Sequence, residues 1–362
     1  MYDPDRAILL GVDLPSKNHI PIEESMAELA RLASTAGAIV VGRMQQKRQM
    51  PDITHYVGSG KLDEIKAMIK STSANMLILD SEIFPSQERN LEEALDIQIV
   101  GRTELILNIF AKHAKSREGK IQVDLAKMQY QLPRLSGMWE HLSRQKGGIG
   151  LRDVGEKQIE IDRRIINKKI SLLKKEIEKL RNEHSIRREN RRRNQIPAVA
   201  LVGYTNAGKS TLLNALTNAG VLTQDKLFAT LDPTTRQFYL PSKRQIVLTD
   251  TVGFIQKLPH QLVAAFRTTL EEVTEADLLL HVVDASHPYY EDQIRAVMIV
   301  LEELKCADKP MITIFNKADK LMQKVPDLIL EKHQPSIIIS ALNNKGLDKL
   351  IGELTKFFST QP

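Results

Sequence analysis

Cysteine is almost absent from this sequence, because Cys306 is the only one among 362 residues. A single thiol excludes an internal disulfide and a cysteine-cluster metal site. No apolar run approaches the roughly 20 residues that a bilayer-spanning helix needs. The first residues, MYDPDRAILLGVDLP, lack the basic segment and long apolar core of a secretory signal. These absences predict a cytoplasmic protein without stable membrane insertion, and they leave peripheral association with a membrane open.

Charge of one sign is not in large excess either, since 51 Lys and Arg residues stand against 45 Asp and Glu residues, for a net charge of +6. The apolar fraction of 42% and the charged fraction of 27% are ordinary for a globular protein. The chain is long enough for two or three domains with separate cores. Shifts in composition predict an N-terminal α/β domain over residues 1–110, a basic helical hairpin over 111–195 and a third domain over 196–362.

The first domain alternates short apolar runs with amphipathic segments, which favours a parallel or mixed sheet covered by helices. The expected strands are Ala7–Leu10, Ala38–Val41, Met76–Leu79 and Ile97–Val100, and the expected helices include Ser25–Ser34 and Lys61–Ile69. The stretch Gly58-Ser59-Gly60-Lys61 resembles a truncated phosphate loop. A plain turn at the start of a helix is the simpler interpretation, and an anion site is the alternative.

The second region has the apolar spacing of two long helices. In the first helix the apolar stripe follows 4-3-4-3 spacing, and Pro133 should kink or end it. A second helix, from about Gly155 to Arg193, repeats apolar residues every seven positions. The two stripes consist of Ile121, Leu125, Met128, Leu132 and Leu135, then Ile159, Ile166, Ile170, Leu173, Ile177 and Leu180. The glycine-bearing tip between them, residues 139–154, completes an antiparallel hairpin. We expect the chain to be a monomer.

Positive charge is concentrated in this hairpin. Residues 151–193 contain 15 Lys and Arg residues and 8 Asp and Glu residues, a local excess of +7. The tip adds Arg144, Lys146 and Arg152 around Gly147, Gly148 and Gly150. A basic rod with a basic tip is suited to phosphate backbones, above all folded RNA, and no signature of a sequence-reading RNA domain or a DNA-binding motif accompanies it. The alternative is a solvated face of a coiled coil.

A phosphate-binding loop opens the third domain. An apolar strand, Ala198–Val202, leads into G-x-x-x-x-G-K-S from Gly203 to Ser210, and a helix follows. Strand before and helix after is the context that this motif requires. The loop amides and the helix N-terminus then face the phosphates. Lys209 reaches the β- and γ-phosphates, and the Ser210 hydroxyl binds Mg²⁺.

Two further motifs follow in the order that a nucleotide switch requires. Residues 228–234, here called the switch loop, are polar and contain proline. We choose Thr230 as the residue that gives its hydroxyl to Mg²⁺ and its amide to the γ-phosphate, with Thr234 and Thr235 as the other candidates. The strand Gln245–Leu248 leads into D-T-V-G, where Asp250 holds Mg²⁺ through water and the Gly253 amide senses the γ-phosphate.

The next two motifs identify the base. The strand Met311–Phe315 leads into N-K-A-D, and Asp319 can accept hydrogen bonds from N1–H and the 2-amino group of guanine. Adenine offers no such pair of donors and would leave the carboxylate, which we expect to be buried, unpaired. The strand Ile337–Ile339 then leads into S-A-L, whose amides can meet guanine O6. The four motifs together predict a mostly parallel P-loop GTPase domain that hydrolyses GTP to GDP and phosphate.

The expected site residues form four groups. They are Gly203, Tyr204, Thr205, Asn206, Ala207, Gly208, Lys209, Ser210 and Thr211; Phe228, Ala229, Thr230, Leu231 and Asp232; Asp250, Thr251, Val252 and Gly253; and Asn316, Lys317, Ala318, Asp319, Ser340, Ala341 and Leu342. Lys209, Thr230 and Gly253 are the expected catalytic residues. Ser210 and Thr230 are the expected Mg²⁺ ligands.

Several long segments of the chain resemble the HflX family of translation-factor-related GTPases. They are GYTNAGKST at 203–211, LFATLDPTTR at 227–236, DTVGFIQKLPHQLVAAFRTTLEE at 250–272 and VVDASHP at 282–288, preceded by QVDLAKMQYQLPRL and LSRQKGGIG. The resemblance implies a GTPase that binds the large ribosomal subunit and its RNA and helps to split, rescue or recycle stalled ribosomes under stress. It also implies that the hairpin carries its tip towards the peptidyl-transferase region.

Two departures from the family pattern bear on this expectation. The family's tip usually continues R-G-P-G-E-T-Q-L-E, whereas residues 152–160 read RDVGEKQIE, so an added acid and a lost proline are expected to alter the RNA contact. The chain also stops at Pro362, soon after the last expected helix of the GTPase domain. Contacts that some members make through a further C-terminal domain are therefore expected to be absent or replaced.

Phe254 stands where Ras-like GTPases place a glutamine that orients the attacking water. Phenylalanine cannot hydrogen-bond water, so we expect slow intrinsic hydrolysis that ribosomal RNA or another group accelerates, or a water-positioning residue elsewhere in the chain. By resemblance to GTPases with an asparagine at the same place, Asn206 could hold K⁺ near the phosphates; the alternative is a hydrogen bond within the loop. Alternative functions are a ribosome-assembly or RNA-modification switch and a protein-regulating G protein with a coiled-coil effector arm.

Overall fold

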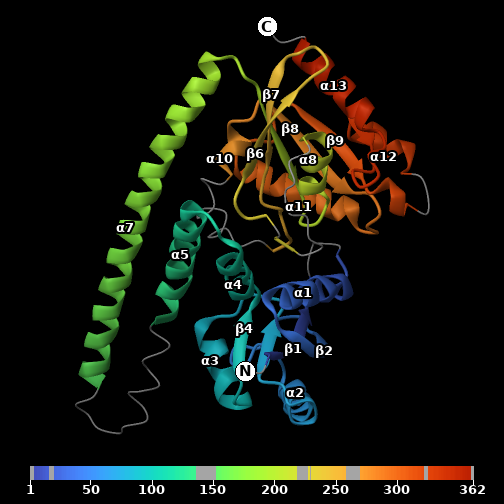
Figure 1. Cartoon of the computed structure of the whole chain (residues 1–362). Coiled ribbons are helices and arrows are strands. Elements are labelled where there is room, and N and C mark those ends of the chain that lie inside the picture. The colour runs from blue at the N-terminus through green and yellow to red at the C-terminus, as the bar shows by residue number, and fades with distance from the viewer. Residues whose placement is uncertain are drawn as a thin grey trace. The chain divides into compact units, whose positions relative to one another are not determined.

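The computed structural model describes residues 4–15, 20–135, 152–217, 227–228, 230–257, 270–321 and 325–359. The chain divides into two compact units (Figure 1). The first unit contains Met1–Lys112 and Lys120–Glu176, and the second contains His113–Gly119 and Ile177–Pro362. Among the described residues, none of the helices combines the length and the apolar character needed to span a bilayer.

The first unit contains a four-stranded parallel sheet of order β2-β1-β3-β4. Its strands are β1 (Arg6–Asp13), β2 (Ile39–Lys47), β3 (Met76–Leu79) and β4 (Gln98–Gly101). The helices are α1 (Ile22–Ala36), α2 (Ser59–Thr72), α3 (Pro85–Leu95) and α4 (Arg102–His113). The four predicted strands and both predicted helices are therefore confirmed, with the helices, β1 and β2 longer than the sequence pattern indicates. Gly58 precedes α2 as its N-terminal cap, so the glycine-rich stretch is a helix start.

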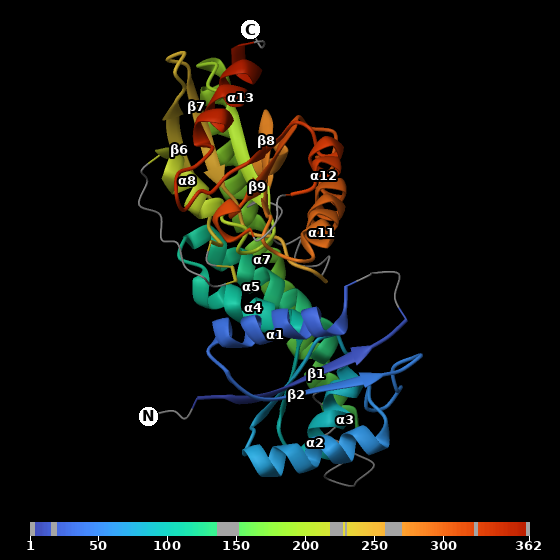
Figure 2. The same cartoon turned by 90° about the vertical axis from the view of Figure 1, so that its right-hand side faces the viewer.

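Continuous apolar runs in the strands allow this sheet to be covered on both faces. Side chains of β1 and β3 such as Ile8, Leu10 and Leu77 pack with Leu62 of α2 and Leu91 of α3 on one face. Helix α1 lies on the opposite face (Figure 2). In such a three-layer arrangement, the side chains on both faces of a parallel strand are buried, which explains why the runs do not alternate with polar residues.

A charged cluster is buried in this unit at the carboxyl ends of β3 and β4. Arg102 is 2% exposed and donates through Nη1 to Asp80 Oδ1 at 2.7 Å and through Nη2 to Glu28. Ser25 Oγ donates to the other Asp80 oxygen at 2.6 Å. The fold itself therefore supplies partners for both oxygens of a buried carboxylate.

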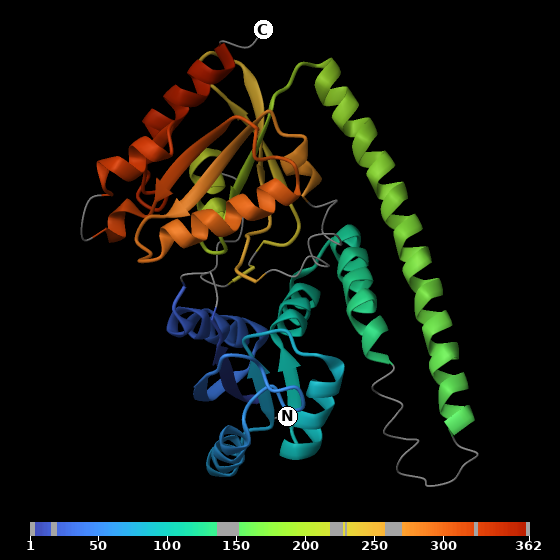
Figure 3. The same ribbon diagram turned by 180° about the vertical axis from the view of Figure 1, so that it is seen from behind.

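Two helices form the predicted antiparallel hairpin (Figure 1 and Figure 3). Helix α5 covers Arg117–Gln131 and ends in a 3-10 turn, η1 (Leu132–Arg134), because Pro133 cannot continue it. Helix α7 covers Arg152–Arg193, 42 residues or about 63 Å at 1.5 Å per residue. Of its heptad positions, Ile170 and Ile177 are buried. The predicted tip up to residue 151 lies outside the described residues.

The second unit contains a six-stranded sheet of order β10-β9-β8-β5-β7-β6, parallel except for the antiparallel edge strand β6. The strands are β5 (Ala198–Gly203), β6 (Thr234–Tyr239), β7 (Gln245–Asp250), β8 (Leu278–Asp284), β9 (Met311–Asn316) and β10 (Ser336–Ile338). The helices are α8 (Lys209–Thr217), α10 (Glu271–Thr274), α11 (Tyr290–Glu303), α12 (Asp327–Lys332) and α13 (Leu347–Ser359), with a 3-10 turn η2 (Ala318–Lys320). The predicted α/β fold class is confirmed.

Two apolar clusters hold the layers of this unit together. Leu212 of α8 and Leu350 of α13 pack on one face of the sheet with Val199 and Leu248. On the other face, Phe315 of β9 packs with residues of α11 and α12. Helices α8 and α13 therefore cover one face, and α11 and α12 the other (Figure 2). This arrangement leaves the carboxyl ends of β5, β7, β8 and β9 at one edge, where ligands of doubly wound sheets bind.

Candidate functional site

The loop between β5 and α8 has the conformation of a phosphate cradle. Gly203 passes so close to β8 that a Cβ atom there would collide with the Val282 carbonyl oxygen. Gly208 has a φ of 97°, which favours glycine, and a Cβ there would collide with the Asn316 amide nitrogen. Both glycines are thus required by close approaches to neighbouring strands, as the motif predicts.

Lys209 lies buried inside this loop, with 6% of its surface exposed. Its Nζ donates to the carbonyl oxygens of Tyr204 at 2.8 Å and Gly203 at 3.2 Å. Burial lowers the pKa of this ammonium group to about 8, and Asp250 opposes the shift. A buried cation whose hydrogen-bond partners are two neutral carbonyls is suited to receive an anionic phosphate.

Ser210, Asp250 and Thr230 meet next to this lysine. Ser210 Oγ donates to Asp250 Oδ2 at 2.6 Å and lies 2.9 Å from Thr230 Oγ1. Asp250 is fully buried, and burial raises the pKa of its carboxyl above the usual range. Among the described residues, neither Asp250 Oδ1 nor the buried Thr205 Oγ1 has a hydrogen-bond partner. Three oxygen-bearing side chains with an unsatisfied carboxylate oxygen form a donor set that fits a hard cation such as Mg²⁺.

The structure distinguishes among the three threonines that are candidates for binding Mg²⁺. Of the three, Thr230 is the one that stands beside Ser210. Thr234 and Thr235 belong to β6 and pair with β7, and the Thr235 hydroxyl lies 3.0 Å from that of Thr249. The side chains of Phe228 and Leu231 are buried, and Ala229 lies outside the described residues.

The D-T-V-G segment packs directly on the phosphate loop. Tyr204 and Phe254 form a backbone bridge, in which Phe254 N–H donates to the Gly203 carbonyl oxygen at 3.0 Å. A Cβ on Gly253 would stand 2.7 Å from Thr205 Cα. Val252, Thr251 and Phe254 are all buried, and Thr251 Oγ1 donates to the Leu201 carbonyl oxygen. The Phe254 ring therefore belongs to the core, and the Gly253 backbone follows the phosphate loop closely.

Asn316, the first residue of N-K-A-D, connects this segment both to the phosphate loop and to S-A-L. Its amide donates to the Ala207 carbonyl oxygen at 2.9 Å, and its oxygen accepts the Ala341 N–H at 3.0 Å. Ser340 Oγ donates to Asp319, which is exposed. Our expectation of a buried Asp319 carboxylate is therefore wrong in this structure. The Leu342 side chain is also exposed, so its backbone amide is the part available to the base.

Sequence reasoning missed Asp284 at this end of the site. Its Oδ2 forms an ion pair with Lys317 Nζ at 2.7 Å, which fixes a lysine whose backbone has a φ of 64°. Asp284 ends β8, so its position at a parallel strand end was a usable signal. Tyr204 was assigned to the nucleotide, and its hydroxyl accepts the Gln256 N–H at 2.9 Å.

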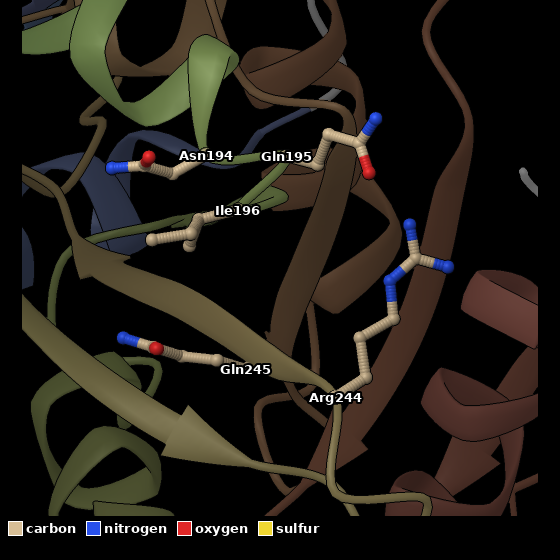
Figure 4. Close-up of a pocket in the computed structure, with 5 residues that line it drawn as sticks. All are labelled: Asn194, Gln195, Ile196, Arg244 and Gln245. Atoms are coloured by element: carbon tan, nitrogen blue, oxygen red, sulfur yellow. The ribbon is translucent and has the colours of Figure 1, made fainter.

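A separate pocket of about 570 Å³, drawn in Figure 4, lies where β5 and β7 begin. It is lined by Asn194, Gln195, Ile196, Arg244 and Gln245. These residues precede or begin β5 and β7, whereas the phosphate loop and Asp250 follow or end those strands. The pocket is thus distinct from the site that the motifs form.

Three family profiles match successive parts of the chain. They are described as GTP-binding GTPase N-terminal, over residues 23–111, GTP-binding GTPase Middle Region, over 113–191, and 50S ribosome-binding GTPase, over 198–317. Among solved structures, a GTP-binding protein from Sulfolobus solfataricus in complex with GDP has a TM-score of 0.51 at 25% identity and covers 99% of this chain and 100% of that chain. The SsGBP and GDP complex has a TM-score of 0.53 at 27% identity, with 97% and 98% covered.

The sequence relatives extend over nearly the whole chain. GTPase HflX of Caldanaerobacter subterraneus subsp. tengcongensis is 48% identical over 96% of this chain and 79% of its own length. GTPase HflX of Escherichia coli is 42% identical over 93% and 79%. The phosphate loop, the buried acid beside it and these relatives agree on an enzyme that hydrolyses GTP. The chain belongs to the HflX family of GTPases.

Proposed function

We propose that the GTP-bound form of this protein binds the large ribosomal subunit through the basic helix α7 and the tip of the hairpin. GTP hydrolysis and phosphate release then dissociate it, and this cycle splits, rescues or recycles ribosomes that stall under stress. The observation that carries the proposal is the basic surface of α7 in a chain whose GTPase domain matches a profile described as 50S ribosome-binding.

The described part of α7 presents a dense set of exposed cations. They are Arg163, Arg164, Lys168, Lys169, Lys174, Lys175 and Lys179. Arg164 pairs with Glu160 in an exposed ion pair, and such pairs contribute little to stability. Neutralising phosphates with exposed Lys and Arg releases counterions, so this surface favours an RNA backbone.

Mg²⁺ fits the oxygen donors next to Lys209. We propose that Ser210 and Thr230 bind the ion directly and that Asp250 holds it through water. Support comes from the 2.9 Å separation of the two hydroxyls and the unsatisfied Asp250 Oδ1. The bound ion supplies charge neutralisation at the β- and γ-phosphates, while Lys209 and the Gly253 amide orient them.

The buried Phe254 ring leaves the attacking water without a side-chain partner at this position. We propose that ribosomal contacts complete the site, and that Asn206, which is exposed at a φ of 61°, holds K⁺. Hydrolysis in K⁺ and Na⁺ at equal ionic strength tests the second point with Asn206→Ala. Wild type should be faster in K⁺ and the variant should not. If the wild type hydrolyses GTP at the same rate in both salts, with and without ribosomes, K⁺ has no role in catalysis.

Co-sedimentation with purified large subunits tests ribosome binding. The full chain should pellet with a non-hydrolysable GTP analogue and remain in solution with GDP. Lys168→Gln with Lys169→Gln should weaken binding and flatten its salt dependence. The matched control changes Lys66 and Lys70, two exposed lysines of α2, to Gln. Equal binding by both double variants at every salt concentration would exclude α7.

The tip is tested in the same assay with Arg144, Lys146 and Arg152 changed to Ala. GTP affinity should stay unchanged, because the proposed role of these three residues is to contact the ribosome and not the nucleotide. A light-scattering assay of intact ribosomes then distinguishes subunit splitting from binding alone. A decrease in scattered light on addition of the protein with GTP indicates splitting. Binding only to immature particles would instead favour the assembly alternative, and no ribosome binding in any nucleotide state would favour a protein partner.

A further inference from the structure

A short connector outside the GTPase motifs contacts the switch loop. This connector, residues His113–Gly119, runs from the last residue of α4 into the first turn of α5 and belongs to the second unit. His113 Nδ1 donates to the Phe228 carbonyl oxygen at 2.8 Å. The backbone N–H groups of Lys115 and Ser116 both donate to Asp232 Oδ2 at 2.9 Å. The two anchored positions, 228 and 232, lie on either side of Thr230.

Ser116 is the centre of this arrangement. Its hydroxyl donates to Asp232 Oδ1 and accepts the Gly119 N–H at 2.8 Å, so it caps the first turn of α5. Asp232 thus lies at a helix N-terminus, where a carboxylate is stabilised by the free N–H groups. A Cβ on Gly119 would collide with Asp232 Oδ1. The Asp232 carboxylate therefore faces the connector, although the sequence motif assigns it to the nucleotide.

We propose that Ser116 and Asp232 are positioning residues for GTP hydrolysis, holding the switch loop so that Thr230 stands next to Ser210. Ordering a loop costs conformational entropy, and a loop already anchored at both ends costs less to order around Mg²⁺ and the γ-phosphate. The anchors favour the GTP-bound state over the GDP-bound state, because GDP lacks the γ-phosphate that the Thr230 amide is proposed to contact. This inference rests on the proposed role of Thr230.

The anchors also link the nucleotide to the chain that leads into the hairpin. Ser116 immediately precedes α5, which is the first helix of that hairpin. A change in the connector must alter the relative affinity for the two nucleotides, and by thermodynamic reciprocity the nucleotide must bias the connector. An event at the hairpin that shifted the connector would therefore act on the hydrolytic site without contacting the nucleotide.

The test measures dissociation constants of a GTP analogue and of GDP for the full chain in Mg²⁺. Ser116→Ala and Gly119→Ala should each weaken analogue binding by about tenfold, because each disrupts a hydrogen bond to a charged group. GDP binding should change less than about twofold, since no proposed GDP contact is removed. Ser116→Thr keeps the hydroxyl and should restore analogue affinity. Asp232→Asn combined with Ser116→Ala should be no worse than Asp232→Asn alone, because the two residues share one contact.

Thr230→Ala distinguishes the two levels of the proposal. If it leaves the ratio of analogue to GDP affinity unchanged, the assignment of Thr230 fails. If Thr230→Ala lowers that ratio and Ser116→Ala does not, the positioning role fails on its own. If Ser116→Ala weakens the binding of both nucleotides equally and lowers the melting temperature, Ser116 acts only as a helix cap. That result would overturn the positioning role.

Discussion

Asp80 in the first unit and Asp250 in the second occupy comparable positions, each buried at the carboxyl end of a parallel strand. Asp80 accepts from Arg102 through Oδ1 and from Ser25 through Oδ2, so both of its oxygens have a partner. Asp250 accepts from Ser210 through Oδ2, and its Oδ1 has no partner among the described residues. The first unit pairs its buried acid with an arginine of the same unit. The second unit keeps a buried acid with an unsatisfied oxygen next to a buried lysine, so a bound cation and a phosphate can supply the missing partners.

This difference shows how similar sheets divide between stability and function. A buried carboxylate that is paired and hydrogen-bonded avoids most of its desolvation cost. A buried carboxylate whose pKa is raised destabilises the free protein, and a cation that binds only the folded form restores that free energy.

Arg102→Met should destabilise the first unit most, by about 3–5 kcal/mol, because it leaves Asp80 and Glu28 buried without their counterion. Urea unfolding followed through the transition of this unit measures the change. Arg31→Met is the control, since Arg31 is half exposed and pairs with Glu24 at the surface, where a pair contributes less than about 1 kcal/mol. If both variants lower the free energy of unfolding by a similar amount, the buried cluster contributes no more to stability than a surface ion pair.

Lys209→Ala should lower kcat/KM for GTP by about 10²- to 10³-fold, the usual loss when one preorganised donor is removed from a developing negative charge. Steady-state phosphate release measures it. Lys349→Ala on α13 removes an exposed lysine of the same unit and should change nothing. Retained activity in Lys209→Ala would contradict the phosphate-loop assignment.

Asp319→Asn should weaken GTP binding by about 10- to 100-fold and improve binding of xanthosine triphosphate, because the amide reverses one donor and one acceptor at the base. Competition between the two nucleotides measures the preference. Asp308→Asn, a change at another exposed acid, serves as the control. An unchanged preference for GTP would exclude Asp319 from base recognition.

Raising the pH should weaken nucleotide binding modestly through Lys209. Burial lowers the pKa of Lys209 to about 8 in the free protein, and bound phosphates raise it again, so binding takes up a proton once the pH exceeds that value. By linkage, affinity should fall about tenfold between about pH 7 and pH 9. Calorimetry in buffers of different ionisation enthalpy measures the proton uptake. Constant affinity across this range would show that Lys209 stays charged in the free protein.

The continuous apolar runs of β1, β3, β5 and β9 were predicted as strands, whereas the equally apolar run of β8 was not. Strand β6 was missed, because its sequence TTRQFY forms an edge strand of intermediate and exposed residues and therefore lacks an apolar run. Thr234 was placed in the switch loop for the same reason. Its pairing with β7 is a contact with a later strand, which local composition does not encode.

The order of the motifs predicted that Lys209, Ser210, Thr230 and Asp250 would meet, because the ends of parallel strands share an edge of the sheet. The contact between Ser116 and Asp232 could not be predicted in this way. These two residues are 116 positions apart, and Ser116 belongs to no nucleotide motif. Only the folded chain brings them together, so neither local composition nor motif spacing could have indicated their contact.

The most direct test compares Asp250→Asn with Asp80→Asn in the nucleotide-free protein at about pH 7.5. Both substitutions keep the shape of a buried side chain and remove its charge. Asp80→Asn should destabilise its unit by about 1–3 kcal/mol, because an amide nitrogen then faces a donor, either Arg102 or Ser25, where the carboxylate offered an acceptor. Asp250→Asn should leave its unit as stable as wild type or more stable, while it removes the Mg²⁺ dependence of GTP binding. Equal destabilisation by both substitutions, or an unchanged Mg²⁺ dependence in Asp250→Asn, would show that Asp250 is not reserved for Mg²⁺.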